Sequence, residues 1–144
     1  MTKEDKGHFA KKHEENQALD RKILEAIRER AVDDDLPCAV AFSIAEDLDV
    51  SPAEVGRAVD IVEKHIIKCQ LGLFGYGPRK SLLSPPESID PELSEAIHQA
   101  LVDGRLPCRA AWDIAKRLGI RKMAVSSACE GLGIKISRCQ LGAF

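Results

Sequence analysis

The stretch LPCAVAFSIAEDLDV at residues 36–50 returns 70 positions later as LPCRAAWDIAKRLGI at residues 106–120. Both copies begin with Leu-Pro-Cys and place Ala, Ile, Ala and Leu at the same offsets. Shifting the chain by 70 positions aligns residues 17–74 with residues 87–144 without a gap, and 21 of the 58 aligned positions are identical. A repeat of this length is typical of a small domain that is present twice. The chain is therefore predicted to be a tandem duplication.

Composition limits the class of protein. The chain has 144 residues, of which 44% are hydrophobic and only 4% aromatic, as expected of small helical domains built on aliphatic residues. No run of 18 apolar residues exists, and the charged start MTKEDKGHFAKKHEENQ lacks the apolar region of a secretory signal. We therefore expect a cytoplasmic protein without a membrane partner. Five cysteines in that compartment indicate reduced thiols and no disulfide framework.

Each unit shows three apolar patterns at helical spacing, followed by a short β-like segment. The second pattern starts at LPC, where Pro37 and Pro107 suit the first helical position. The third follows a tight turn and starts with a capping-box pair, Ser51 and Glu54. A strand is predicted within residues 134–141, with a bulge or an end before Cys139 because its alternation breaks there.

Domain boundaries follow from the repeat. The predicted organisation is a charged extension at 1–16, a first unit at 17–74, a linker rich in Gly, Pro and Ser at 75–88, and a second unit at 89–144. The repeated phrases CQLGLF (69–74) and CQLGAF (139–144) are expected to close the units. In each phrase Cys and Leu would point inward, Gly would form a turn and Phe would act as a hydrophobic plug. A unit of this size has a marginal core, so the two units are expected to pack together as a pseudo-dimer.

The segments IAEDLDVSPAEVGRAVD (44–60) and IAKRLGIRKMAVSSACE (114–130) carry a family resemblance. An apolar-Ala pair, a Leu, a turn and a capped helix resemble a helix-turn-helix, and the trailing strand makes each unit similar to a winged helix-turn-helix domain. The resemblance implies a mainly α fold of two three-helix units. Because the second copy stops at Phe144, directly after its first wing strand, a complete two-stranded wing is not expected there.

The resemblance also implies a DNA-binding surface on the helix after the turn. Residues 17–74 carry 7 basic against 12 acidic residues, whereas residues 87–144 carry 8 against 7. Double-stranded DNA is therefore expected to bind chiefly through the second unit. The candidate DNA-binding residues are Arg109, Arg121, Lys122, Ser126, Ser127 and Arg138 in the second unit, Ser51 and Arg57 in the first, and Arg79 and Lys80 in the linker.

The repeated cysteines form a second candidate site. Cys38 and Cys69 recur as Cys108 and Cys139, and the first of each pair falls in the first turn of a helix, where the dipole favours a thiolate. Four thiols from two copies could form one metal site, although no C-x2-C spacing occurs. The alternative, which we favour, is that the four are small apolar core residues.

Three functions follow in order of preference. The first is sequence-specific DNA binding in transcriptional regulation. The second is a protein-interaction or scaffold module that uses the same fold without DNA, with the acidic first unit as the partner-binding part. The third is a thiol-based metal or redox sensor. No nucleophile–base pair or nucleotide loop stands out, so neither an enzyme nor a cofactor is expected. The oligomeric state stays open between a monomer with internal pseudo-twofold symmetry and a homodimer.

Overall fold

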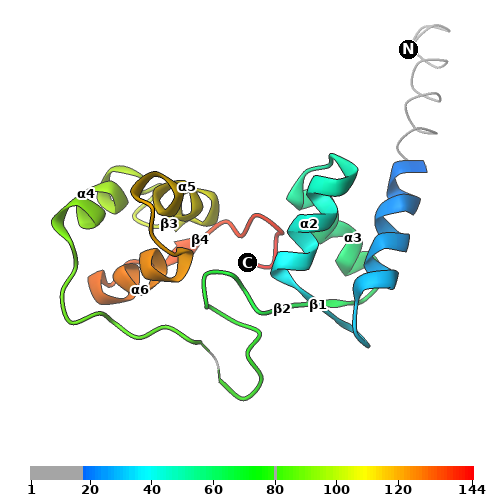
Figure 1. Cartoon of the computed structure of the whole chain (residues 1–144), viewed down its shortest axis with the longest axis horizontal. Helices are drawn as coiled ribbons and strands as arrows, with labels where there is room; N and C mark the ends of the chain where they lie inside the picture. The colour runs from blue at the N-terminus through cyan, green and yellow to red at the C-terminus, as the bar shows by residue number, and fades with distance from the viewer. Residues whose placement is uncertain (1–17, 80) are drawn as a thin grey trace, which may run out of the picture.

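The computed structural model describes residues 18–79 and 81–144. Most of the regular structure is helical, which confirms the mainly α class (Figure 1). Residues 18–30 form the described part of the first helix. The next elements are β1 (Asp35–Pro37), α2 (Cys38–Leu48), α3 (Pro52–Ile61) and β2 (His65–Ile67). After the linker come α4 (Pro91–Gln99), β3 (Leu106–Pro107), α5 (Cys108–Leu118), α6 (Lys122–Leu132) and β4 (Ile136–Ser137). No helix among the described residues is both long and apolar enough to span a bilayer.

Local signals in the sequence explain the ends of α2, α3 and α5. The Ser51 hydroxyl accepts a hydrogen bond from the backbone N–H of Glu54, and the Glu54 carboxylate accepts one from the N–H of Ser51, so the predicted capping box is confirmed. Gly119 ends α5 in the left-handed conformation, with φ of 67°. Asp49 adopts the same conformation after α2, which Asp tolerates better than most residues.

The prediction for the Leu-Pro-Cys motif was only partly correct. Leu36 and Pro37 belong to β1, and Leu106 and Pro107 form β3. Each proline is the N-cap residue with extended backbone, and the helix starts at the following cysteine. The prediction that proline occupies the first helical position is therefore wrong by one residue. The fixed φ of proline also fits a strand end, so its helix-start preference alone could not decide the position.

The strands pair in parallel. β1 pairs with β2 so that Leu36 lies opposite Ile66, and β3 pairs with β4 so that Leu106 lies opposite Ile136. The predicted strand within 134–141 is confined to Ile136 and Ser137, and it ends before Arg138, whose φ is 49°. The expected break before Cys139 is thus confirmed. The named strand pairs of the described chain are parallel, and they do not form a hairpin wing.

Two hydrophobic cores lie in the two lobes seen in Figure 1, and each contains residues from both repeats. The core around α4, α5 and α6 includes the buried side chains of Cys69 and Leu71. The core around α2, α3 and the first helix includes the buried side chain of Leu141. The C-terminal segment, red in Figure 1, leaves the lobe of α5 and ends beside the lobe of α2. The phrases at 69–74 and 139–144 are called the exchanged loops below.

The exchanged loops have the same internal structure. The backbone N–H of Cys69 donates to the Phe74 carbonyl at 3.1 Å, and the equivalent bond joins Cys139 to Phe144 at 3.1 Å. Gly72 takes a positive φ of 77° in the turn, as the sequence predicted for this glycine. The inward direction of Leu was also right, but its destination was not. Leu71 and Leu141 enter the core of the opposite lobe, so the loops do not close their own units.

Candidate functional site

The N-terminal half of α6 carries three of the predicted DNA-binding residues and contacts an exchanged loop. Ser126 is buried, and its hydroxyl donates to the backbone carbonyl of Leu71 at 2.6 Å. The Lys122 ammonium donates to Gln70 Oε1 at 3.0 Å and lies 3.9 Å from the centroid of the Trp112 ring. The Ser126 side chain is therefore not exposed on the surface of α6, and its role in DNA binding stays a prediction. The charge of Lys122 is committed to a cation–π contact and a hydrogen bond inside the protein.

The equivalent half of α3 contacts the other exchanged loop. Gly56, which aligns with Ser126, lies so close to the Leu141 backbone that a Cβ atom added to it would be 1.7 Å from the Leu141 oxygen. Each third helix thus presents the same position to the loop of the opposite repeat. The Ser126 hydroxyl donates a hydrogen bond to the Leu71 carbonyl. At Gly56 the absence of a side chain leaves room for the Leu141 carbonyl.

Two aromatic pairs join positions that are 70 residues apart. The ring centroids of Phe42 and Trp112 are 4.3 Å apart, and those of Phe74 and Phe144 are 6.1 Å apart with perpendicular rings. Contacts between aligned positions are what an approximate twofold relation between the two repeats would produce. These pairs and the exchanged loops join the two repeats.

The other predicted site residues are distributed over the surface. Arg121 is exposed at the N-cap of α6, Ser127 is half-buried, and Arg109 is exposed on α5. The hydroxyl of Ser51 is engaged in the cap of α3, and Arg57 is exposed on the same helix. Arg79 is exposed and forms an isolated backbone bridge with Tyr76, whereas Lys80 lies outside the described residues. The structure does not bring these side chains together on one face of α6.

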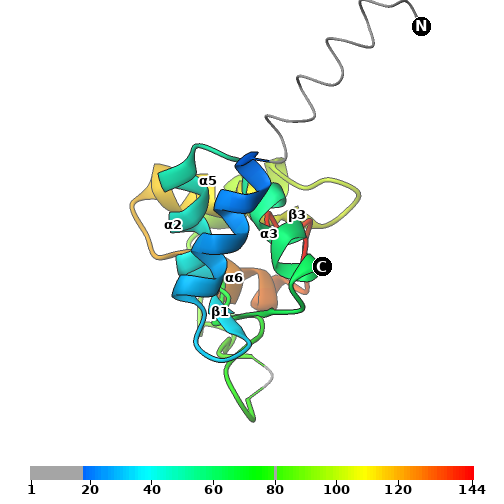
Figure 2. The ribbon, with the colours of Figure 1, turned by 90° about the vertical axis from the view of Figure 1, so that its right-hand side faces the viewer.

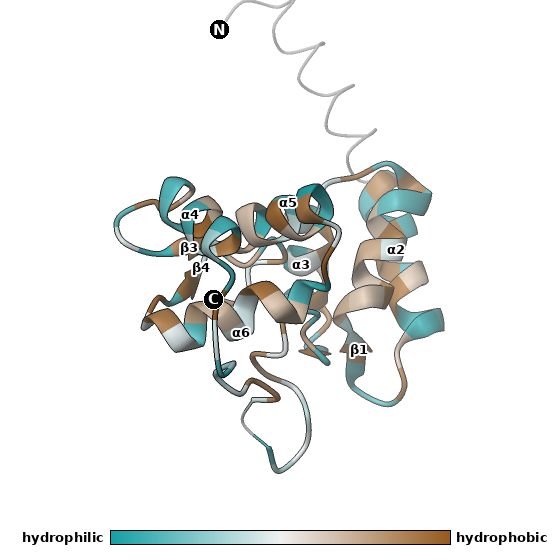
Figure 3. Cartoon of the chain, turned by 60° about the vertical axis from the view of Figure 1, so that its left-hand side comes forward, coloured by the Kyte–Doolittle hydropathy of each residue, from teal (hydrophilic) through white to brown (hydrophobic). Residues whose placement is uncertain are grey.

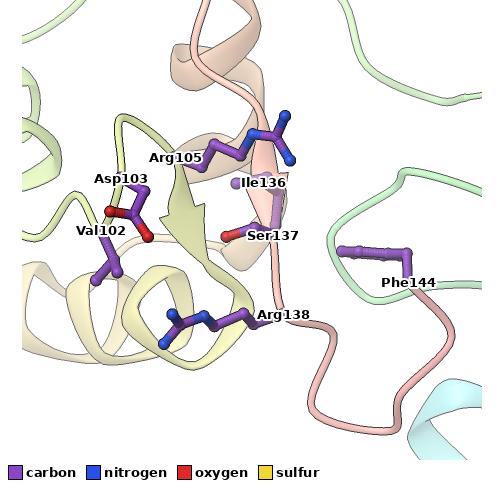
Figure 4. A pocket seen from close by; sticks show the side chains of 7 residues that line it. All are labelled: Val102, Asp103, Arg105, Ile136, Ser137, Arg138 and Phe144. Carbon is purple, nitrogen blue, oxygen red and sulfur yellow. The ribbon is translucent and has the colours of Figure 1, made fainter.

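Arg138 lines a hollow of about 720 Å³ at the end of β4 (Figure 4). Arg105 and Ser137 lie in the same wall, and Phe144 closes the far side. The two guanidinium groups point away from each other in Figure 4, and the carboxylate of Asp103 adds a negative charge to the lining. The hollow therefore lacks the converging cations that an anion site needs.

The repeated cysteines lie where the repeats meet. Cys38, Cys69 and Cys108 are buried, and Cys139 is half-buried. The amide of Gln70 approaches the Cys38 sulfur at 3.6 Å, and that of Gln140 approaches the Cys108 sulfur at 3.5 Å. The five cysteines are free thiols, and residues 18–79 and 81–144 contain no group of three or more potential ligands placed to hold a metal.

Burial controls the ionisation of these thiols. Desolvation raises the pKa of Cys38 and of Cys108, and the hydrogen bonds from the glutamine side chains only partly oppose it. Cys38 and Cys108 do lie in the first turn of α2 and α5, as predicted. Burial therefore favours the neutral thiols of Cys38 and Cys108, opposite to the direction that the helix end was expected to give. The buried positions of Cys38, Cys69 and Cys108 agree with the favoured interpretation that these cysteines are core residues.

An apolar groove lies between the first helix and α3, which are side by side in Figure 2. Leu19, Leu24 and Ile61 line a hollow of about 420 Å³, and Leu24 and Ile61 continue into a second hollow of about 400 Å³. Ile61 is 67% exposed, more than any other large hydrophobic side chain of the described residues except Val32. The sequence patterns did not predict this groove. The signal that could have indicated it is the alignment of Ile61 with Gly131, because the two repeats differ strongly in side-chain size at this position.

No known protein family, curated protein or solved structure matches the chain. Its function must therefore be inferred from its own residues.

Proposed function

We propose that the chain is a protein-interaction module in which two winged-helix-like units pack as a pseudo-dimer. The observation that carries this proposal is the contact that each third helix makes with the loop of the opposite repeat. The N-terminal half of α6 contacts Leu71, and that of α3 contacts Leu141, each from the opposite repeat. The surface that a helix-turn-helix uses for DNA is the surface that this chain uses for its own assembly.

The geometry explains why DNA reading is the weaker alternative. A recognition helix inserts its N-terminal residues into the major groove, so these side chains must be free. On α6, Ser126 is buried, Lys122 is held by Gln70 and Trp112, and Gly131 lies against Pro86 of the linker. Opening this assembly would expose Leu71 to water, and a buried leucine contributes about 1.5–3 kcal/mol of hydrophobic free energy.

The surface of the first repeat supports a protein partner. Val32 and Ile61 are the two most exposed large hydrophobic side chains among the described residues, and both belong to this repeat. The balance of 7 basic against 12 acidic residues in positions 17–74 repels nucleic acid phosphates. Exposed aliphatic residues with a charged surround are typical of protein interfaces.

A thiol-based sensor is less well supported. Metal ligation and thiol oxidation both proceed through the thiolate, whereas burial raises the pKa of Cys38 and Cys108. The sensor would therefore have to open the interface between the repeats before its thiols could react.

Two parallel measurements test the proposal. In the first, fluorescence anisotropy follows a mixed-sequence DNA duplex titrated with the full chain at low salt, and we expect no saturable binding. In the second, wild type, Ile61→Lys and the matched control Ile120→Lys are compared as baits in extract from the source cell. We expect a defined partner that wild type and the control retain and Ile61→Lys loses. Saturable, salt-dependent DNA binding that Arg121→Glu abolishes would overturn the proposal in favour of DNA recognition.

A further inference from the structure

The groove of the first repeat is continuous and open. Leu24 and Ile61 line both of its hollows, and Leu19 lies at one end. Lys64 lines the second hollow and donates to the Asp33 carbonyl and the Asp34 carboxylate, each at 3.1 Å. These bonds hold the turn that carries Val32, itself 73% exposed, beside the groove. The two most exposed large hydrophobic side chains of this repeat are thus Ile61, in the groove, and Val32, on the turn bonded to Lys64.

In the second repeat, a linker residue lies against the equivalent position of α6. Gly131 occupies the position of Ile61, and a Cβ atom added to it would lie 3.4 Å from Cδ of the linker residue Pro86. The same Cβ atom would lie 3.2 Å from Cδ1 of Ile89, which is the residue of the second repeat that aligns with Leu19. In the first repeat Ile61 stands at the equivalent position and is exposed. The two repeats differ in what covers an otherwise equivalent surface.

The charges around the groove indicate the occupant. Acidic and basic residues are equal in number among those that line it: Asp20, Glu54 and Glu63 against Arg28, Arg57 and Lys64. Glu54 and Lys64 already have partners within the chain. Two acids and two bases are left, so a partner of one charge sign would meet repulsion as well as attraction. A second copy, rotated by a twofold axis, can place acidic groups opposite basic ones.

We propose that this groove is an isologous interface for a second copy of the chain, with Ile61 near its centre. The inference rests on the proposed function as a protein-interaction module and names one partner. An aliphatic centre with a mixed polar rim matches the usual anatomy of such interfaces. The groove is small beside the roughly 800 Å² per partner of a standard interface, so the dimer is expected to be weak, in the micromolar range.

Sedimentation velocity of the purified full chain tests this directly. From about 1 μM to about 1 mM, the range of weak dimers, the mass should rise from 15.8 kDa toward twice that value. Ile61→Lys should weaken the dimer at least about tenfold, as expected for a central residue. Ile120→Lys exchanges a partly exposed isoleucine outside the groove and should leave the dimer unchanged. Circular dichroism melting verifies that both variants are folded.

A charge-swap mixture gives the sharper result. The double variant Arg28→Glu/Arg57→Glu has an acidic rim, and Asp20→Lys/Glu63→Lys has a basic rim, so each should stay monomeric alone. Mixed in equal amounts, they should form a heterodimer. A wild type that stays monomeric to about 1 mM, a dimer that Ile61→Lys leaves intact, or a mixture that stays monomeric would overturn the second-copy interface. If the second copy does not bind but an Ile61-dependent partner is captured, the proposed function is retained and only the second-copy interface is overturned. Saturable, salt-dependent DNA binding that Arg121→Glu abolishes would overturn the proposed function itself.

Discussion

Ser126 and Leu71 belong to different repeats and are joined by a buried hydrogen bond of 2.6 Å from the serine hydroxyl to the leucine carbonyl. The equivalent positions, Gly56 and Leu141, are in direct backbone contact. The two contacts show that each repeat completes the core of the other. The stability of each lobe is therefore expected to depend on a leucine from the opposite repeat.

Truncation of an exchanged leucine should destabilise the opposite lobe. Leu71 and Leu141 are buried, so replacement of either by Ala should cost about 2–5 kcal/mol. Hydrogen exchange measured by mass spectrometry locates the effect. Leu71→Ala should reduce protection first in α5 and α6, and Leu141→Ala first in α2 and α3. Loss of protection in the lobe that is contiguous with the mutated loop in sequence would contradict the exchange.

Replacement of glycine by alanine should lower the stability of the protein much more in α3 than in α6. A Cβ atom at Gly56 would meet the Leu141 carbonyl at 1.7 Å, so Gly56→Ala must displace backbone and should cost at least about 3 kcal/mol. Gly131 is its control, because a Cβ atom there meets the end of the Ile89 side chain at 3.2 Å, which can move. Gly131→Ala also gains helix propensity, and its net effect should lie within about 1 kcal/mol of zero. Urea unfolding measures both, and equal effects would contradict the close contact at Leu141.

The hydroxyl of Ser126 should contribute more to the stability of the protein than the hydroxyl of Ser127. Ser126→Ala leaves the Leu71 carbonyl buried without this donor, which should cost about 1–3 kcal/mol. Ser127 is half-buried, so Ser127→Ala should change stability by less than about 0.5 kcal/mol. Thermal melting separates the two variants. If their melting temperatures are the same, the bond to Leu71 does not contribute to stability.

Stability should fall in alkali because of Cys129. Desolvation raises the pKa of this thiol from 9.0 to about 11. The native state therefore keeps the proton more tightly than the unfolded state. The contribution is fully present below pH 9 and is lost as the pH rises toward about 11. Two pKa units correspond to about 3 kcal/mol.

The variant Cys129→Val tests this pH dependence, since Val59 fills the aligned position of the first repeat. Urea unfolding between pH 7 and pH 11 can be followed by the fluorescence of Trp112, the only tryptophan. The difference in unfolding free energy between wild type and variant should be flat up to pH 9 and then shift in favour of the variant. A difference that stays constant to pH 11 would show that the thiol does not titrate with folding.

Patterns within one segment predicted local structure well. The spacing of Ala41, Ile44 and Ala45 predicted the buried face of α2, and all three are buried. The same pattern gives α5 its two-sided character, with brown and teal alternating around it in Figure 3. The capping box at Ser51 and the turn glycine at 119 were read correctly because each depends only on neighbours in sequence.

Properties that depend on distant segments were not predictable in this way. Ser126 is a small polar residue, as expected at an exposed helix position. It is buried in the structure, where it contacts Leu71, which lies 55 residues earlier in the chain. The ionisation of Cys38 was misjudged because desolvation depends on what packs around the thiol. The groove at Ile61 was not predicted, because the exposure of this residue depends on which segments of the folded chain lie against it.

The sequence by itself determined the duplication, the helical class, the start of α3 and the end of α5, because apolar spacing and capping act over a few residues. Apolar residues in the two CQLG phrases indicated that Leu71 and Leu141 would be buried. Only the tertiary structure decided that each leucine is buried in the opposite lobe. The hydrophobic effect rewards the removal of apolar area from water, whichever surface covers it, so periodicity carries no information about the partner. The choice depends on which cavity the chain can reach and fill, and here Gly56 and Ser126 provide the room and the hydrogen bond.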